Sequence, residues 1–169
     1  MFEVGDIIMY GSSGVCRVSG VSPSKDVKEH GRMYYELSPV YSGCTIYTPA
    51  DNQKVHMRPI ISREEAEALI DEIPSIHAQG YHNRVLRQLT EHYEAILRSH
   101  DCHELVRMLM SLYEKKRELE GQKRRFGLVD ARYMKRAEEL LHGELAAALG
   151  LDISQVQPYI QKRVAALES

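Results

Sequence analysis

The residues that could perform chemistry form small clusters, and each cluster also has a structural explanation. The run Gly11–Gly14 is glycine-rich, but it lacks the Lys-Ser/Thr pair of a phosphate-binding loop, so a tight hairpin turn explains it equally. His100, Cys102 and His103 could supply metal ligands, yet a stable zinc site needs three or four convergent ligands. They flank an expected helix start, where capping and packing are the alternative. We therefore predict neither an enzyme nor a bound cofactor or metal.

The segment Glu144–Ile160 has the pattern of a helix-turn-helix that reads DNA. It has small residues in a first helix, a glycine where the chain turns, and a second helix. However, Pro158 occupies a place where a reading residue is usually exposed, and the first basic residue of the second helix is Lys162. Two ordinary packed helices separated by a glycine stop remain the alternative.

Basic residues are concentrated in the middle of the chain. Residues 84–136 contain thirteen Lys or Arg against eight Asp or Glu, although the whole chain has a net charge of −2. Four groups of basic residues fall on expected helices or their ends: Arg84 and Arg87; Lys115, Lys116 and Arg117; Lys123, Arg124 and Arg125; Arg132, Lys135 and Arg136. If the helices form a bundle, the groups converge and contact phosphates without reading base identity. A solvated helix face is the alternative for each group alone.

The residues from Phe2 to about Arg58 have the pattern of short strands. Strands are expected over 7–10, 15–18, 33–40 and 44–48, with turns at Gly11–Gly14 and Tyr41–Gly43. Residues 21–31 are expected to form a loop or a ragged hairpin arm. Pro49 is expected to end the last strand, because proline has no N–H to donate. Several short strands with glycine turns predict a small, strongly bent sheet or a partly open barrel.

After Pro59 the period of the apolar residues changes from that of strands to that of helices. Ser62 and Glu65 form a capping box, and helices are expected over 63–73, 85–97, 102–120, 130–149 and 153–167. We therefore predict an α+β protein, with a small β domain at residues 1–60 and an all-helical domain at residues 61–169.

Composition bounds the remaining possibilities. No apolar run approaches the roughly 20 residues of a membrane helix, and the N-terminus lacks the basic and apolar parts of a signal peptide. The three cysteines are widely spaced and odd in number, which favours reduced packing residues. We expect a cytoplasmic monomer.

Residues in both halves resemble the CarD/CdnL transcription regulators, and the first half also resembles the RNA-polymerase-interacting domain of transcription-repair coupling factor. In the first half the matching residues are Phe2, Gly5, Asp6, Tyr10, Gly14, Val15, Tyr35, Leu37 and the run Ile46–Asn52. In the second half they are Ser99–Asp101, Asp130–Arg132, Ala137, Leu141 and Gly143–Ala146.

The resemblance implies a Tudor-like (SH3-like) β-barrel that docks on the β-subunit lobe of bacterial RNA polymerase. Family members add an edge strand to a strand of that lobe, a mode known as β-augmentation. Here the edge would be Cys44, Thr45, Ile46, Tyr47 and Thr48. Relatives often carry an arginine where this chain has Tyr47, so the charged contact is assigned to Lys25.

The resemblance also implies that the helical domain lies on promoter DNA, where relatives wedge a tryptophan at the minor groove. This chain has no tryptophan, and the corresponding position is Leu86, with Tyr81 as a second candidate. The DNA-binding residues assigned in this way and from the basic groups are Arg84, Leu86, Arg87, Lys123, Arg124, Arg125, Arg132, Lys135 and Arg136.

These inferences predict a non-enzymatic transcription regulator that joins RNA polymerase to promoter DNA and modulates the stability of the open complex. The missing tryptophan and the overall acidity leave one alternative open, a polymerase-binding adaptor that does not contact DNA.

Overall fold

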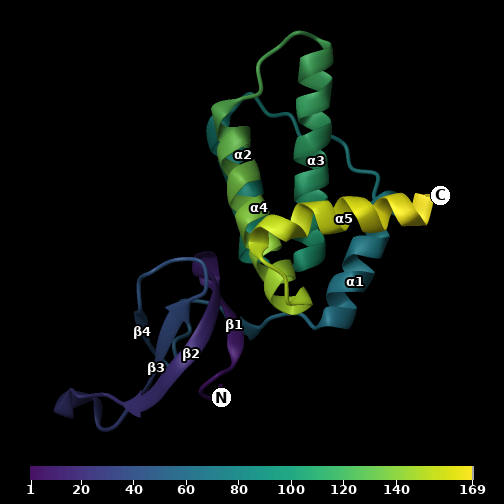
Figure 1. Ribbon diagram of the computed structural model, residues 1–169. Helices are drawn as coiled ribbons and strands as arrows, with labels where there is room; N and C mark the ends of the chain where they lie inside the picture. Colours follow the sequence, from purple (N-terminus) through teal and green to yellow (C-terminus); the bar gives the residue numbers. More distant parts are fainter. Residues whose placement is uncertain (169) are drawn as a thin grey trace. The chain divides into compact units, whose positions relative to one another are not determined.

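The computed structural model describes residues 1–168, which form two compact units of different class. The first unit, Met1–Ile61, is an antiparallel sheet, and the second, which begins at Ser62, is built of helices (Figure 1). The chain is therefore α+β, as predicted. Within residues 1–168, no helix combines the length and the apolar character needed to cross a bilayer.

The sheet has five strands in the order β4-β3-β2-β1-β5. They are β1 (Ile7–Tyr10), β2 (Gly14–Pro23), β3 (Met33–Pro39), β4 (Ile46–Pro49) and β5 (Met57–Pro59). Short 3-10 turns occupy Gly11–Ser13, in the β1–β2 hairpin, and Val27–Glu29. Strand β2 continues to Pro23, so the first residues of segment 21–31 form a hairpin arm, the second of the two expected forms. Strand β5 was not predicted.

The core of the sheet follows the two-residue period of its strands. Its buried residues are Ile8, Cys16, Val18, Tyr35 and Leu37. Burial raises the pKa of the Cys16 thiol to about 11, so the thiol stays protonated at neutral pH and packs as a small apolar side chain.

The helical unit contains five α-helices joined by short connections and one long strap. They are α1 (Arg63–Glu72), α2 (Leu86–Arg98), α3 (Cys102–Gly121), α4 (Leu128–Leu149) and α5 (Ile153–Glu168), and a 3-10 turn spans Ile73–Ser75. Two helix ends have the expected cap residues: Ser62 accepts from the Glu65 N–H, and Gly150 ends α4 at φ +69°. We call residues 76–85, which have no regular structure and lead into α2, the strap.

Helices α2 and α4 run in the same direction, with α3 antiparallel to both (Figure 1). Two side-chain hydrogen bonds join α2 to α4: the Tyr93 hydroxyl donates to Asp130, and the Tyr133 hydroxyl donates to Glu94. Consequently α2 and α4 begin at the end of the unit where α3 finishes. We call this end the tip and define it as residues 84–87 and 123–128.

Candidate interaction surfaces

Strand β4 is the outermost strand of its sheet and pairs only with β3 among the described residues. The Ala50 N–H donates to the Met33 carbonyl at 2.9 Å, which marks that pair as hydrogen-bonded. Since antiparallel pairs alternate, Thr48 and Ile46 also direct their backbone groups at β3. The N–H and C=O of Tyr47, between them, therefore point away from β3, towards the open edge.

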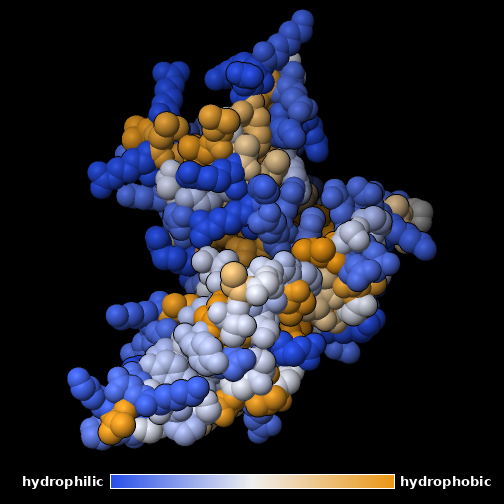
Figure 2. All heavy atoms as spheres, turned by 60° about the vertical axis from the view of Figure 1, so that its left-hand side comes forward, coloured by the Kyte–Doolittle hydropathy of each residue, from blue (hydrophilic) through white to orange (hydrophobic). Residues whose placement is uncertain are grey.

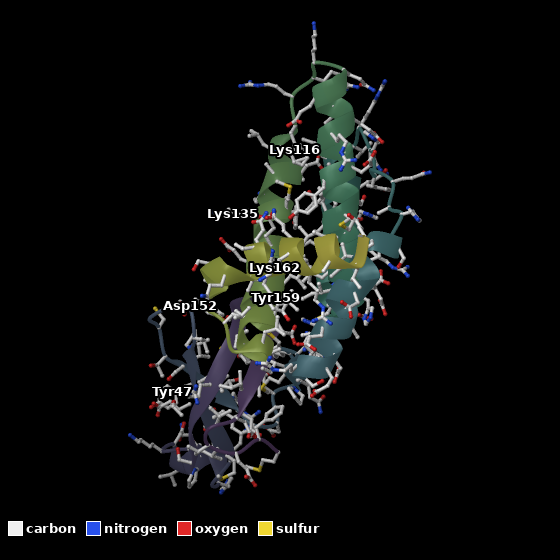
Figure 3. All side chains as sticks on the ribbon, turned by 45° about the vertical axis from the view of Figure 1, so that its right-hand side comes forward. Tyr47, Lys116, Lys135, Asp152, Tyr159 and Lys162 are labelled. Atoms are coloured by element: carbon white, nitrogen blue, oxygen red, sulfur yellow. The ribbon has the colours of Figure 1, made fainter. Side chains whose placement is uncertain are left out.

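The side chains of β4 divide between the two faces of the sheet. Ile46 is half-buried against the core, and Thr48 is only 1% exposed, with its hydroxyl accepting from Tyr10 and Asn52. Tyr47 is 66% exposed, and its hydroxyl donates to Glu36 Oε2 at 2.9 Å. Figure 3 labels Tyr47 on this unit. An incoming strand would meet the backbone groups and the side chain of Tyr47, whereas the backbone groups of Thr48 face β3 and its side chain is buried.

The strand boundaries differ from those expected. Cys44 and Thr45 are exposed but precede β4, which begins at Ile46. Pro49 does not end the ladder, because it faces Tyr34 at a position whose backbone groups point away from β3, so its missing N–H costs no bond. Lys25 is exposed in the loop between β2 and β3.

The opposite edge of the sheet is less able to accept a strand. Strand β5 has three residues, and Ile60 N–H donates to the Ile7 carbonyl, so the backbone of Pro59 points outwards by the same alternation. Pro59 has no N–H, and its carbonyl already accepts from Arg58 Nη1 at 3.0 Å. Short strands and prolines are the usual protection of sheet edges. Strand β4 is therefore the edge suited to pairing.

The tip of the helical unit combines basic and apolar side chains. Its exposed basic residues are Arg84, Arg87, Lys123, Arg124 and Arg125. Exposed large apolar residues stand beside them: Val85 (51%), Leu86 (63%) and Leu128 (89%). Figure 2 shows orange side chains among blue ones at this end of the unit. Isolated exposed apolar residues are common, but three at one end form a patch.

One side of α4 extends the charge of the tip. Arg132 and Lys135 are exposed and lie four and seven residues after Leu128, so all three share a helix face. Figure 3 labels Lys135 on α4 and Lys116 on α3. Arg136 is different, because it is half-buried and its Nη1 lies 3.0 Å from Glu94 Oε1. The Tyr133 hydroxyl and then Arg136 hold the pKa of Glu94 below its ordinary value, so the charge of Arg136 is already paired.

Lys115 does not belong with the exposed basic residues, which corrects the four-group expectation. Its side chain is 7% exposed, and its Nζ lies 2.8 Å from Oδ2 of Asp130. The side chain of Asp130 is itself only 4% exposed. The Tyr93 hydroxyl donates to the other carboxylate oxygen at 2.5 Å. Burial, and then this hydrogen bond, raise the pKa of Tyr93, which keeps it a donor. Lys115 therefore joins α3 to α4.

Tyr81, in the strap, is engaged within the protein. Its ring stacks on His92 with centroids 3.7 Å apart and an interplanar angle of 11°. Burial lowers the pKa of His92, so the imidazole is neutral at pH 7. Inserting Tyr81 elsewhere would first break this stack, whereas Leu86 is already exposed. The geometry favours Leu86 of the two wedge candidates.

The possible metal cluster is dispersed. The buried Cys102 thiol lies 2.9 Å from Glu144 Oε1, while His103 lies on the surface between Glu72 and Asp101. Within residues 1–168, no group of three or more His, Cys, Asp or Glu side chains could hold a metal ion.

The comparison with protein families decides the nature of the first unit. Residues 2–61 match the family model described as the CarD-like/TRCF RID domain. The first unit is a CarD-like/TRCF RID domain. The resemblance inferred from the sequence is thereby confirmed over these residues.

The RID domain is a non-catalytic interaction domain, and its presence implies a transcription-related protein that interacts with RNA polymerase. The match ends at residue 61, at the boundary of the first unit, so it assigns no role to the helices. The structure exposes the basic residues expected to contact DNA, apart from the paired Arg136, and adds Leu128, which the sequence interpretation missed.

Proposed function

We propose that this protein is a transcription regulator with two separate contacts. Its RID domain, a Tudor-like sheet, adds β4 to a strand of the RNA polymerase β-subunit lobe. Its helical unit places the tip against promoter DNA near the melted region. The observation that carries the proposal is the edge position of β4, with the Tyr47 backbone pointing outwards from a domain of a polymerase-binding family.

Strand addition suits β4 for reasons of both energy and specificity. Backbone hydrogen bonds to the incoming strand supply affinity, and alternate side chains supply specificity. Ile46 and Thr48 turn inwards and hold the strand on its own sheet, so little rearrangement precedes pairing. Proteins normally protect exposed sheet edges from pairing with other strands, and this sheet protects the β5 edge but leaves the β4 edge accessible.

Contact with DNA is supported by the composition of the tip. Arg84, Arg87 and Lys123–Arg125 would neutralise phosphates, and Arg132 and Lys135 would extend this contact along α4. Leu86 would act as the apolar wedge against a base step at the edge of melted DNA. Such a wedge fits partly unstacked DNA better than intact duplex, and only this difference in affinity can shift the equilibrium towards the open complex.

The polymerase contact is tested with Tyr47→Pro. Proline removes the outward N–H of Tyr47 and tolerates this edge position, since that N–H makes no bond to β3. We expect binding of the full chain to an isolated β-subunit lobe to fall at least about tenfold. Tyr47→Phe keeps the N–H and serves as the matched control. Ile46→Arg is a poorer test, because Ile46 packs against the core. A folded Tyr47→Pro protein that binds the lobe normally would refute strand addition.

The DNA contact is tested with Arg124→Glu/Arg125→Glu on a forked promoter fragment. Binding should weaken equally for different promoter sequences, and the slope of log K against log salt should fall by about 2 if both arginines meet phosphates. Lys28→Glu/Lys54→Glu, in the RID domain, changes the net charge by the same amount and should keep the original slope. A loss confined to one sequence would contradict phosphate contact.

The alternative function is an adaptor that binds polymerase without DNA. The absence of tryptophan and the net charge of −2 favour it. If the unaltered protein binds the lobe but not the forked fragment at low salt, the adaptor replaces the regulator.

A further inference from the structure

The outer face of β3 and β4 carries a single charged side chain. Strand β3 reads MYYELSP and β4 reads IYTP, so Glu36 is the only charged residue of the two strands. Glu36 pairs across the sheet with Tyr47, and the Tyr47 hydroxyl donates to its carboxylate at 2.9 Å. The other oxygen of the Glu36 carboxylate, Oε1, does not accept the hydrogen bond from Tyr47. A negative charge and an aromatic ring thus lie together at the open edge.

The position of Tyr47 determines where a partner side chain would lie. Its backbone N–H and C=O point outwards, so in antiparallel pairing the partner residue opposite Tyr47 would bond to it directly. Side chains that face each other across neighbouring strands lie on the same face, with Cβ atoms about 4.5 to 5.5 Å apart. The partner side chain would therefore lie against the Tyr47 ring, within reach of Glu36 for a long side chain.

Both groups at this position favour a cation. The face of an aromatic ring attracts Lys and Arg, and their aliphatic stems pack on it. The Glu36 carboxylate would pair with the charged head, and covering by the partner strand would strengthen that pair. A partner carboxylate would instead face Glu36 with no cation on either strand to compensate.

We propose that the strand which pairs with β4 carries a lysine or arginine opposite Tyr47, recognised by Glu36 and the Tyr47 ring. This inference rests on the strand addition proposed above and adds the chemistry of the partner residue. In this contact the chain supplies the negative charge, through Glu36, whereas an arginine at position 47, as relatives often carry, would supply a positive charge.

The test measures binding of full-length variants to the isolated β-subunit lobe over a range of salt concentrations. We expect Glu36→Lys to weaken binding about tenfold or more at low salt, and the neutral Glu36→Gln to weaken it less. Glu36 is partly exposed, and thermal unfolding checks that the sheet is intact in both variants. The decisive arm exchanges the charges: changing the basic lobe residue opposite Tyr47 to Glu should restore the binding of Glu36→Lys.

Outcomes for this inference and for strand addition are separable. If Tyr47→Pro abolishes binding while Glu36→Lys binds as well as the unaltered protein, the strand is added but its partner residue is not basic, which overturns the inference. If Tyr47→Pro leaves binding intact, strand addition itself fails, and this inference fails with it.

Discussion

Replacement of Lys115 by methionine should destabilise the helical unit strongly, although Lys115 lies in a run of basic residues. Lys115 and Asp130 are both almost fully buried, and their charged atoms are 2.8 Å apart. At that distance two unit charges attract by about 6 kcal/mol with an effective dielectric constant of 20. Most of this attraction offsets the cost of removing both charges from water.

Methionine keeps the length of the side chain but leaves the Asp130 charge with only the Tyr93 hydroxyl as a partner. Breaking a buried ion pair on one side typically costs about 3 to 5 kcal/mol. Domains are stable by only about 5 to 15 kcal/mol, so a large share of the stability would be lost. Tyr93→Phe removes one hydrogen bond to a charged group and should cost less, about 1.5 to 3 kcal/mol.

Urea unfolding followed by the helical signal of circular dichroism is the appropriate assay, because the α-helices of residues 1–168 all belong to the second unit. The double replacement Lys115→Met/Asp130→Leu removes both charges and should recover part of the loss, because it also leaves the Tyr93 hydroxyl without its acceptor. Lys116→Met, at the next and more exposed position, is the matched control and should change stability by less than about 0.5 kcal/mol. A Lys115→Met protein as stable as this control would refute the reasoning.

Three further predictions concern the same unit. Gly150→Ala should lower the free energy of unfolding by about 1 to 2 kcal/mol, because a residue with a side chain is strained at the Gly150 φ of +69°. Gly121→Ala, where a Cβ meets no atom within 4 Å, should raise it by up to about 1 kcal/mol. Equal effects of the two variants in urea unfolding would contradict the role of the positive φ at Gly150. Gly80→Ala should lower the free energy of unfolding by about 1 to 3 kcal/mol and speed proteolysis within the strap, because the new Cβ would lie 2.9 Å from Lys115 Cβ and 3.0 Å from its Cα. An unchanged rate of cleavage would show that the strap moves to accommodate the Cβ without cost. Arg163 holds the pKa of Asp71 below its ordinary value of 3.8, so this ion pair between α1 and α5 stabilises the fold at neutral pH, and the stabilisation is lost as the pH falls below 3.8 through the folded-state pKa. Arg163→Met should therefore flatten the acid side of the plot of unfolding free energy against pH, and an identical plot would refute the linkage.

Local signals were enough to predict most helix ends and most strands. Ser62 and Gly150 act at their own helix ends. Strand β5 escaped prediction because its three residues, Met57–Pro59, have no pattern of their own. They become a strand only by pairing with β1, which lies almost fifty residues earlier.

The start of α4 was predicted two residues late for a similar reason. Aspartate is a common residue at the start of a helix, and the helix was expected to begin at Asp130. In the structure Asp130 lies inside the helix and faces Lys115 of α3. An aspartate that caps a helix and one that pairs in the core have the same local sequence, and the distant partner decides between them.

Helical position, more than the number of charges, distinguishes structural from exposed charges in this unit. Lys115 falls on the apolar stripe of α3, with Met108, Leu112 and Leu119, and is buried with them. Leu128 shows the converse, since it shares its stripe with Arg132 and Lys135 and is 89% exposed. A charge on an apolar stripe needs a buried partner, because an unpaired buried charge is too costly to keep. An apolar side chain on a polar stripe has no such requirement, so folding alone does not account for Leu128. With Leu86, also exposed at the tip, it would supply an apolar surface for the proposed contact with unstacked bases.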